Sequence, residues 1–169
     1  MKIAIIGSHG VGKSTISKLL AQELDLPIIP DIVLEAHQKG FAINKNTPAE
    51  TQFWLFAKQL ELEKLTEKFI ADKCLIDYSV YADVLFPDQR VKDLLSEMIR
   101  RNANYTHMFY LPIEFAIEDD GLRSTDPTFQ KNIDDRYRQV LDDWGFKYEI
   151  VGGDIETRLK KILNIIKDN

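Results

Sequence analysis

The sequence predicts an α/β fold of three layers, α/β/α, in which a five-stranded parallel sheet lies between helices. Two observations lead to this prediction. Short apolar segments alternate with longer segments of helical periodicity along the 169 residues, an order typical of strands joined by helical crossovers. The first apolar segment, residues 2–6, also leads through a glycine-rich turn directly into a helical segment, residues 13–24. We expect one domain over residues 1–169, because chains of this length usually fold around one core.

Composition and charge exclude several classes of function. Hydrophobic residues make up 44% of the chain and charged residues 29%, which is ordinary for a globular protein. The net charge of −5 argues against a nucleic-acid partner and against an anionic membrane surface. No apolar stretch approaches the ~20 residues of a membrane-spanning helix, and the single cysteine, Cys74, cannot form an internal disulfide. We therefore expect a cytoplasmic protein that binds neither nucleic acid nor membrane.

The glycine-rich turn contains a complete phosphate-loop motif. Residues 7–14 read Gly-Ser-His-Gly-Val-Gly-Lys-Ser, which matches G-x-x-x-x-G-K-[ST] between a strand and a helix. The glycines let backbone N–H groups converge on one point, and the positive end of the helix adds to the attraction for an anion. From the motif we expect Lys13 to reach the β- and γ-phosphates of a nucleotide and the Ser14 hydroxyl to bind Mg²⁺.

The second strand is expected over residues 27–30, where two isoleucines stand between prolines. We expect it to lie beside the first strand, in parallel, with Asp31 emerging at its carboxyl end. A carboxylate there can accept a proton from a substrate hydroxyl. Asp31 can equally cap the helix that begins near Val33, and the sequence leaves both roles open. Glu35, one helical turn further on, is the reserve candidate for the base.

A long helix is expected over residues 48–71, and its aromatic side chains favour packing in the core. Gln52 and Gln59 are the polar groups of this helix best suited to read the edge of a base. They make this helix a wall of the expected small-molecule pocket.

The third strand is expected over residues 73–77 and includes Cys74, whose thiol should be buried. Asp77 ends this segment. An acid at the end of a strand, in a chain with a phosphate loop, is the usual second Mg²⁺ contact. The alternative is that Asp77 caps a helix starting at Ser79.

The rest of the chain continues the alternation. The expected elements are a helix over residues 88–101, a strand over 106–111, a helix over 127–144, a strand over 146–151 and a helix over 154–167. Residues 112–138 combine an irregular acidic stretch with the start of a helix, and we expect them to form a lid that closes over the phosphates. An arginine in such a lid can stabilise charge on a transferred phosphoryl group.

These motifs together resemble the phosphate-loop (P-loop) nucleoside and nucleotide kinases over nearly the whole chain. Residues 77–83, Asp-Tyr-Ser-Val-Tyr-Ala-Asp, resemble the [DE]-R-S segment of deoxyribonucleoside kinases and the D-R-Y segment of thymidylate kinases. Residues 31–36 resemble the acid-bearing turn after the second strand. Leu-Pro at 111–112, followed by Asp-Gly-Leu-Arg at 120–123, resembles the lid of the ribosylnicotinamide-kinase-like AAA ATPases. Tyr78 is a departure, because these families place arginine after the acid.

The resemblance implies ATP and Mg²⁺ as cofactors and gives roles to particular residues. Catalysis would rest on Lys13 and Arg123, which neutralise charge, and on Asp31 as the base that activates the acceptor hydroxyl. Ser14 and Asp77 would hold Mg²⁺. The residues that would hold the ATP phosphates are Gly7, Ser8, His9, Gly10, Val11, Gly12, Lys13, Ser14 and Thr15.

The acceptor is the open question. A nucleoside monophosphate usually needs arginine for its phosphate, and the first arginine in the chain, Arg90, follows the expected acceptor region, residues 31–83. A neutral nucleoside is therefore the favoured acceptor. A thymidylate-kinase-like monophosphate kinase, with lysines in place of arginine (Lys39, Lys45 or Lys58), is the alternative. A P-loop ATPase without a small acceptor is the other alternative, and the oligomeric state, homodimer included, stays open.

Overall fold

One parallel sheet forms the centre of the protein, with its strands in the order β2-β3-β1-β4-β5. The computed structural model describes residues 1–43, 45, 47–117, 119, 121 and 123–168. The strands are β1 (Lys2–Ile6), β2 (Ile28–Ile29), β3 (Phe69–Asp72), β4 (His107–Tyr110) and β5 (Glu149–Ile150). The helices are α1 (Lys13–Leu24), α2 (Val33–Gln38), α3 (Ala49–Leu65), α4 (Leu75–Leu85), α5 (Gln89–Asn102), α6 (Pro127–Asp143) and α7 (Ile155–Lys167). In these segments no helix has the length and apolar composition needed to cross a membrane.

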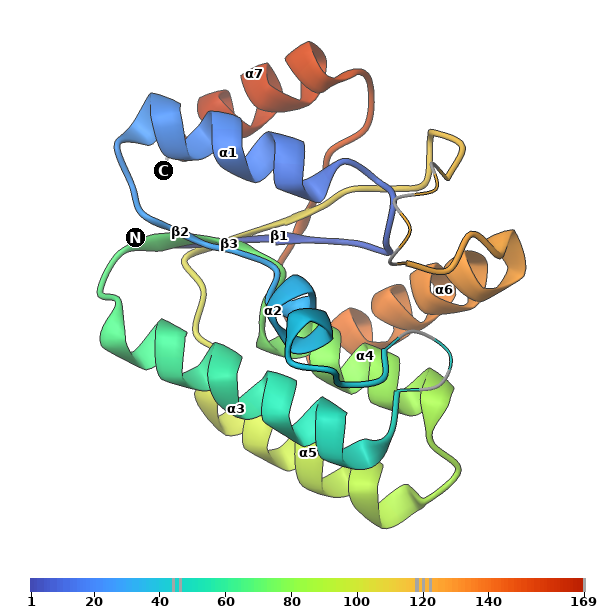
Figure 1. Ribbon diagram of the computed structural model, residues 1–169. Coiled ribbons are helices and arrows are strands. Elements are labelled where there is room, and N and C mark those ends of the chain that lie inside the picture. Colours follow the sequence, from blue (N-terminus) through green and yellow to red (C-terminus); the bar gives the residue numbers. More distant parts are fainter. Residues whose placement is uncertain (44, 46, 118, 120, 122, 169) are drawn as a thin grey trace.

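The central strand β1 shows why three layers form. Its side chains alternate between the two faces of the sheet, as in any strand. Ile3 and Ile5 pack into an apolar cluster with α1 and α7, whereas Ala4 and Ile6 pack into a second cluster with α3, α4, α5 and α6. Figure 1 shows α1 and α7 on one side of the sheet and the larger set of helices on the other. The three-layer α/β fold expected from the sequence is confirmed.

The expected position of the second strand is wrong. β2 pairs with β3, and β3 occupies the place beside β1. Strands that are neighbours in sequence need not be neighbours in a parallel sheet, since the crossover through α1 is long enough to pass over one position. The consequence for function is direct: the residues that follow β3 emerge next to the phosphate loop that follows β1.

The expected third strand is also wrong. α3 ends at Leu65 rather than at residue 71, and β3 covers Phe69–Asp72 rather than residues 73–77. Residues 69–71 and 74–76 are both short apolar runs, and periodicity cannot separate a short strand from a helical turn in such runs. The strand-ending acid is therefore Asp72. Helix α4 begins at Leu75, directly after Cys74, whose side chain is buried as expected.

The remaining bounds lie within one residue of the expected ones, except that β5 is reduced to Glu149–Ile150. The expected lid, residues 112–138, divides into two parts. Its second part belongs to α6, whose buried side chains, such as Ile133 and Tyr137, pack in the main core. Its first part includes Asp120 and Leu122 of the lid motif, and these two lie outside the described residues.

Candidate active site

The phosphate loop connects β1 to α1 and its backbone requires glycine. Gly12, with φ of 88°, precedes the first turn of α1, and Gly7 has φ of 137°. A Cβ at Gly7 would lie 2.5 Å from the carbonyl oxygen of Leu111, so no other residue fits there. Lys13 is buried, and its Nζ donates hydrogen bonds to the carbonyl oxygens of Gly7 at 2.9 Å and Ser8 at 2.6 Å. Burial lowers the pKa of Lys13 to about 8.

Asp72 stands beside Ser14 of the phosphate loop. It ends β3, and its carboxyl is almost fully buried. Burial raises the pKa of Asp72, while a hydrogen bond from Ser14 and the charge of Lys13 oppose that rise. Its Oδ1 atom is buried without a hydrogen-bond partner in the described part of the chain. An unpaired carboxylate oxygen beside a serine hydroxyl is a donor set that suits Mg²⁺, which takes its remaining ligands from phosphates and water.

Asp77 is hydrogen-bonded within the protein through both carboxylate oxygens, and its charge also acts on Lys13. It is the third residue of α4, and its Oδ2 accepts a hydrogen bond from the backbone N–H of Cys74 at 2.8 Å, as in a capping box. Its Oδ1 accepts a hydrogen bond from the hydroxyl of Tyr137 on α6. Asp77 thus has the local structural role that the sequence left open, though for the helix at Leu75 rather than at Ser79.

Asp31 follows β2 and is held between two cations. Its Oδ2 accepts a hydrogen bond from a guanidinium nitrogen of Arg123 at 2.9 Å, and its Oδ1 lies 3.9 Å from the ammonium of Lys73. Oδ1 also accepts a hydrogen bond at 3.1 Å from the N–H of Val33, the first residue of α2. Burial raises the pKa of Asp31, but Lys73, Arg123 and the Val33 N–H outweigh burial and hold it below its usual value. The carboxylate is therefore ionised and paired.

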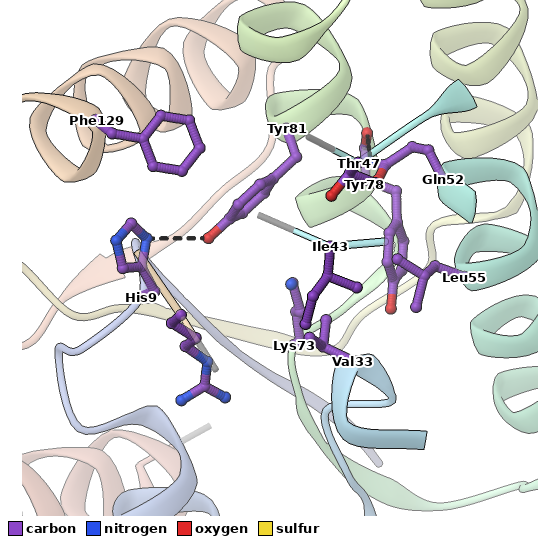
Figure 2. Close-up of a pocket in the computed structure, with 11 residues that line it drawn as sticks. His9, Val33, Ile43, Thr47, Gln52, Leu55, Lys73, Tyr78, Tyr81 and Phe129 are labelled. Atoms are coloured by element: carbon purple, nitrogen blue, oxygen red, sulfur yellow. Dashed lines mark hydrogen bonds between the residues drawn. The ribbon is translucent and has the colours of Figure 1, made fainter. Parts of the chain in front are cut away.

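A cavity opens beside the partners of Asp31, at the carboxyl ends of the strands: Val33, Lys73 and Arg123 line it, whereas Asp31 itself is not among its lining residues. Figure 2 shows the side chains that line the cavity. Lys73, Tyr78 and Tyr81 come from the segment after β3 and face side chains from distant segments, such as His9 and Phe129. The residues that line it are His9, Val33, Ile43, Thr47, Gln52, Leu55, Lys73, Tyr78, Tyr81, Arg123 and Phe129. Its free space is about 40 Å³, which is enough for a few water molecules. We call it the acceptor pocket.

A second cavity, of about 410 Å³, lies over the phosphate loop. The residues that line it are Gly10, Gly12, Lys13, Ser14, Thr15, Phe115, Ala116, Arg123 and Ile155. Arg123 lines both cavities, so the acceptor pocket and this second cavity, which we call the donor cavity, share this residue.

His9 connects the phosphate loop to the acceptor pocket. Its Nδ1 lies 3.4 Å from the hydroxyl of Tyr81, a contact drawn as the dashed line in Figure 2. Its backbone carbonyl oxygen accepts a hydrogen bond from Gln130 of α6 at 2.6 Å. Burial, together with the charges of Lys13 and Lys73, lowers the pKa of His9 to about 4. The imidazole is therefore neutral near pH 7 and adds no charge to the pocket.

The two glutamines of α3 lie in different surroundings. Gln52 lines the acceptor pocket, where its Nε2 donates a hydrogen bond to the carbonyl oxygen of Tyr78 at 2.6 Å. Gln59 is completely buried behind the pocket and bonds to Glu63 and to the carbonyl oxygen of Lys73. The expectation that Gln59 reads a base edge is wrong, because its amide is already occupied inside the protein.

Asp72 and Lys73 are the residues of the candidate site that sequence reasoning did not single out. The signal was present: an apolar run, residues 69–71, followed by an acid and then a base. With β3 ending at Asp72, the position after the strand-ending acid is Lys73 rather than Tyr78. The apparent departure at Tyr78 therefore disappears, since a cation does follow the acid, as lysine instead of arginine.

A family model described as an AAA domain matches residues 2–158 of the chain. Among curated proteins, none matches the sequence significantly. Among solved structures, deoxyadenosine kinase from M. mycoides with the products dCMP and a flexible dCDP bound has a TM-score of 0.74 at 20% identity, over 100% of both chains. The NadR protein in complex with NR has a TM-score of 0.81 at 18% identity, over 99% of this chain and 50% of that chain. Thymidylate kinase from Ehrlichia chaffeensis has a TM-score of 0.70 at 14% identity, over 98% of both chains.

These identities are low, so the solved structures establish likeness of fold. The family model covers most of the chain, and its match includes the phosphate loop, Asp31, the Asp72-Lys73 pair and Arg123. The chain therefore belongs to the AAA domain family, and its fold is that of the P-loop nucleoside and nucleotide kinases.

Proposed function

We propose that this protein transfers the terminal phosphoryl group of ATP to a hydroxyl of a small nucleoside-type acceptor. One observation carries the proposal: the donor cavity over the phosphate loop and the acceptor pocket beside Asp31 meet at Arg123. A phosphate bound to the loop and a hydroxyl bound in the pocket would face each other across this arginine. Such positioning, with electrostatic stabilisation, is the main source of catalysis in phosphoryl transfer.

On the donor side, the N–H groups of the loop and the Lys13 ammonium would hold the phosphates. Lys13 bonds to two carbonyl oxygens of its own loop, and a phosphate offers it a full negative charge instead. Ser14 and Asp72 would hold Mg²⁺, which would neutralise charge on the phosphates. This assigns to Asp72 the metal contact that the sequence gave to Asp77.

On the acceptor side, Asp31 is the proposed base. Its carboxylate would take the proton of the acceptor hydroxyl while the hydroxyl oxygen bonds to the γ-phosphorus and the bond to the ADP oxygen breaks. Asp31 is bonded to Arg123 in this structure, so Arg123 must release it first. Phosphates in the donor cavity, which Arg123 also lines, would draw the guanidinium away.

A nucleoside monophosphate acceptor is the second candidate, and the structure strengthens it. The absence of arginine from residues 31–83 favoured a neutral acceptor. The fold nevertheless brings Arg123 to the acceptor pocket, next to the buried cation Lys73. The three lysines considered before are paired with acids instead, Lys39 with Glu35, Lys45 with Asp126 and Lys58 with Glu61. A phosphate in the pocket would therefore bind Lys73 and Arg123.

The structural neighbours support both candidates. One solved neighbour is a deoxyadenosine kinase with dCMP bound, one is a NadR protein in complex with NR, and one is a thymidylate kinase. The free space of about 40 Å³ is smaller than any of these acceptors, so binding would have to displace side chains of the acceptor pocket.

The test is ADP release from ATP and Mg²⁺ against a panel of nucleosides, ribosylnicotinamide and nucleoside monophosphates. We expect stimulation by at least one nucleoside. Stimulation only by monophosphates would support the second candidate. Turnover that ignores every acceptor would contradict both and identify an ATPase. The Lys13→Ala variant, carried through the same panel, reports contaminating activity.

A further inference from the structure

Lys73 has an unusual backbone for its residue type. Its φ is 94°, in the left-handed region that only glycine enters freely. A non-glycine residue persists there only when its surroundings hold it. Its side chain is buried, with Nζ 3.9 Å from Asp31 and 4.5 Å from the centre of the Tyr81 ring. The backbone of Lys73 thus aims a cation at the proposed base from a strained position.

Gln59 bonds to this strained residue from α3. Its Nε2 donates hydrogen bonds to the carbonyl oxygen of Lys73 at 3.1 Å and to Glu63 at 2.8 Å. Its Oε1 accepts a hydrogen bond from the hydroxyl of Tyr78 at 3.4 Å. Both ends of the carboxamide are therefore occupied, and Gln59 is fully shielded from solvent.

The corner between β3 and α4, which begins at Lys73, is also held at its other end, Leu75. The hydroxyl of Tyr105 accepts a hydrogen bond from the N–H of Leu75 at 3.0 Å and donates to the carboxylate of Glu63 at 2.8 Å. The corner between β3 and α4 is thus fixed at Lys73 through Gln59 and at Leu75 through Tyr105. Glu63 joins the two anchors. We call Gln59, Glu63, Lys73, Tyr78 and Tyr105 the Gln59 network.

We propose that Gln59 is a positioning residue: it holds the backbone of Lys73 in its left-handed conformation and thereby keeps the Lys73 ammonium against Asp31. Without the Gln59 amide, the Lys73 carbonyl oxygen loses its buried donor, and an unpaired buried carbonyl is costly. Rotation of the backbone would relieve both the strain and the unpaired oxygen, and it would turn the side chain away from Asp31. The effect on phosphoryl transfer rests on the proposed function, whereas the effect on the conformation of Lys73 does not.

The first test is the crystal structure of a Gln59→Leu variant, which removes the amide and keeps the side chain buried. We expect Lys73 to leave the left-handed region and its ammonium to move away from Asp31. Should this variant fail to fold, Gln59→Met, which retains the length of the side chain, replaces it. A variant structure in which Lys73 keeps its conformation and its contact with Asp31 would overturn the proposal, whatever the protein's activity.

The second test separates positioning from plain stability by kinetics. We expect Gln59→Leu to lower kcat by ~10–10²-fold through misplacement of Lys73, with the KM for ATP almost unchanged. In a Lys73→Met background, the same change should cause no further loss of kcat, because the group through which Gln59 acts is gone. Thr51→Val, a buried polar-to-apolar change on the same helix but outside the Gln59 network, is the matched control.

Losses that multiply in the double variant would show that Gln59 does not act through Lys73. A kcat for Thr51→Val as low as that of Gln59→Leu would show a general effect of damage to α3. Both results would overturn the positioning role. If the unmodified protein transfers no phosphoryl group to any acceptor, the proposed function fails, and the crystal structure alone decides the role of Gln59.

Discussion

The donor cavity and the acceptor pocket are built in opposite ways. The phosphate loop is one continuous segment, residues 7–15, set between a strand and a helix that adjoin it in sequence. The acceptor pocket is assembled from segments as far apart as His9 and Phe129. The first is a local structure that a motif can specify. The second exists only after the sheet, α3 and α6 have come together.

The two regions also differ in backbone and in size. In the phosphate loop the left-handed positions are glycines, such as Gly12, whereas beside the acceptor pocket the left-handed residue is Lys73. The donor cavity measures about 410 Å³ and the acceptor pocket about 40 Å³. The donor side is thus preformed without strain, while the acceptor side has little free space and depends on distant contacts. Four predictions test this contrast.

The largest effect is expected on the donor side. Lys13→Ala removes the cation of the phosphate loop, so we expect kcat/KM for ATP to fall by ~10³–10⁵-fold, the range that a transition-state cation contributes in phosphoryl transfer. ATP affinity, measured by calorimetry, should fall as well. Lys18→Ala, an exposed lysine five residues further along α1, is the control. Full activity in Lys13→Ala would remove the basis of the donor site.

Asp31→Asn tests the acceptor side and should separate it from the donor side. We expect kcat to fall by ~10²–10⁴-fold because the proposed general base is lost. ATP affinity should stay within a few-fold of that of the unmodified protein. Glu35→Gln is the control, since Glu35 is the reserve candidate and is only half-buried, with an ion pair to Lys39. If Glu35→Gln loses turnover and Asp31→Asn does not, the two roles are reversed.

We expect Glu63, which joins the two anchors of the β3–α4 corner beside the acceptor pocket, to make the stability of the protein depend on pH. Burial, against hydrogen bonds from Gln59 and Tyr105, raises the pKa of Glu63 from 4.5 to about 7. The folded protein then binds a proton that the unfolded chain releases, so this contribution to stability is complete below pH 4.5 and is lost as pH rises through about 7. The loss amounts to at most ~3 kcal/mol.

Urea unfolding at about pH 5 and about pH 8 measures this linkage. We expect Glu63→Gln, which cannot titrate, to remove this fall in the free energy of unfolding, so that the variant gains stability relative to the unmodified protein as pH rises from about 5 to about 8. Glu67→Gln, at an exposed position two residues after the end of α3, should leave the pH dependence of the unmodified protein unchanged. Equal pH dependence in the Glu63→Gln variant and the unmodified protein would contradict the raised pKa.

The smallest effect concerns strain at Lys73. Because glycine adopts positive φ freely, we expect Lys73→Gly to be more stable than Lys73→Ala by ~1 kcal/mol in thermal or urea unfolding. At Lys92, within the regular helix α5, the same pair should rank in the opposite order, because glycine costs about 1 kcal/mol in a helix. If Lys73→Ala is more stable than Lys73→Gly, as expected for the alanine variant at Lys92, Lys73 is not strained.

The accuracy of the sequence-based predictions differs in the same way between segments with local signals and regions assembled from distant segments. The phosphate loop, α1, α5 and α7 have strong local signals, and their bounds were predicted within one residue. The region around β3 has weak signals, because the apolar runs at 69–71 and 74–76 fit either a strand or a helical turn. Because of that ambiguity the strand was expected at residues 73–77, its final acid was taken to be Asp77 instead of Asp72, and Lys73 was not recognised. For the same reason the family arginine was compared with Tyr78, which is buried in α4.

The sequence by itself determined the class of fold and the phosphate loop, because that loop is made by short-range backbone geometry that its own glycines permit. Only the tertiary structure decided the neighbour of β2, the acid that faces Ser14 and the cations that surround Asp31. Each of these depends on contacts between segments far apart in the chain, such as that of Asp31 with Arg123. The packing of α3 against the β3–α4 corner, which fixes Lys73, is of the same kind, and no local pattern of residues encodes it.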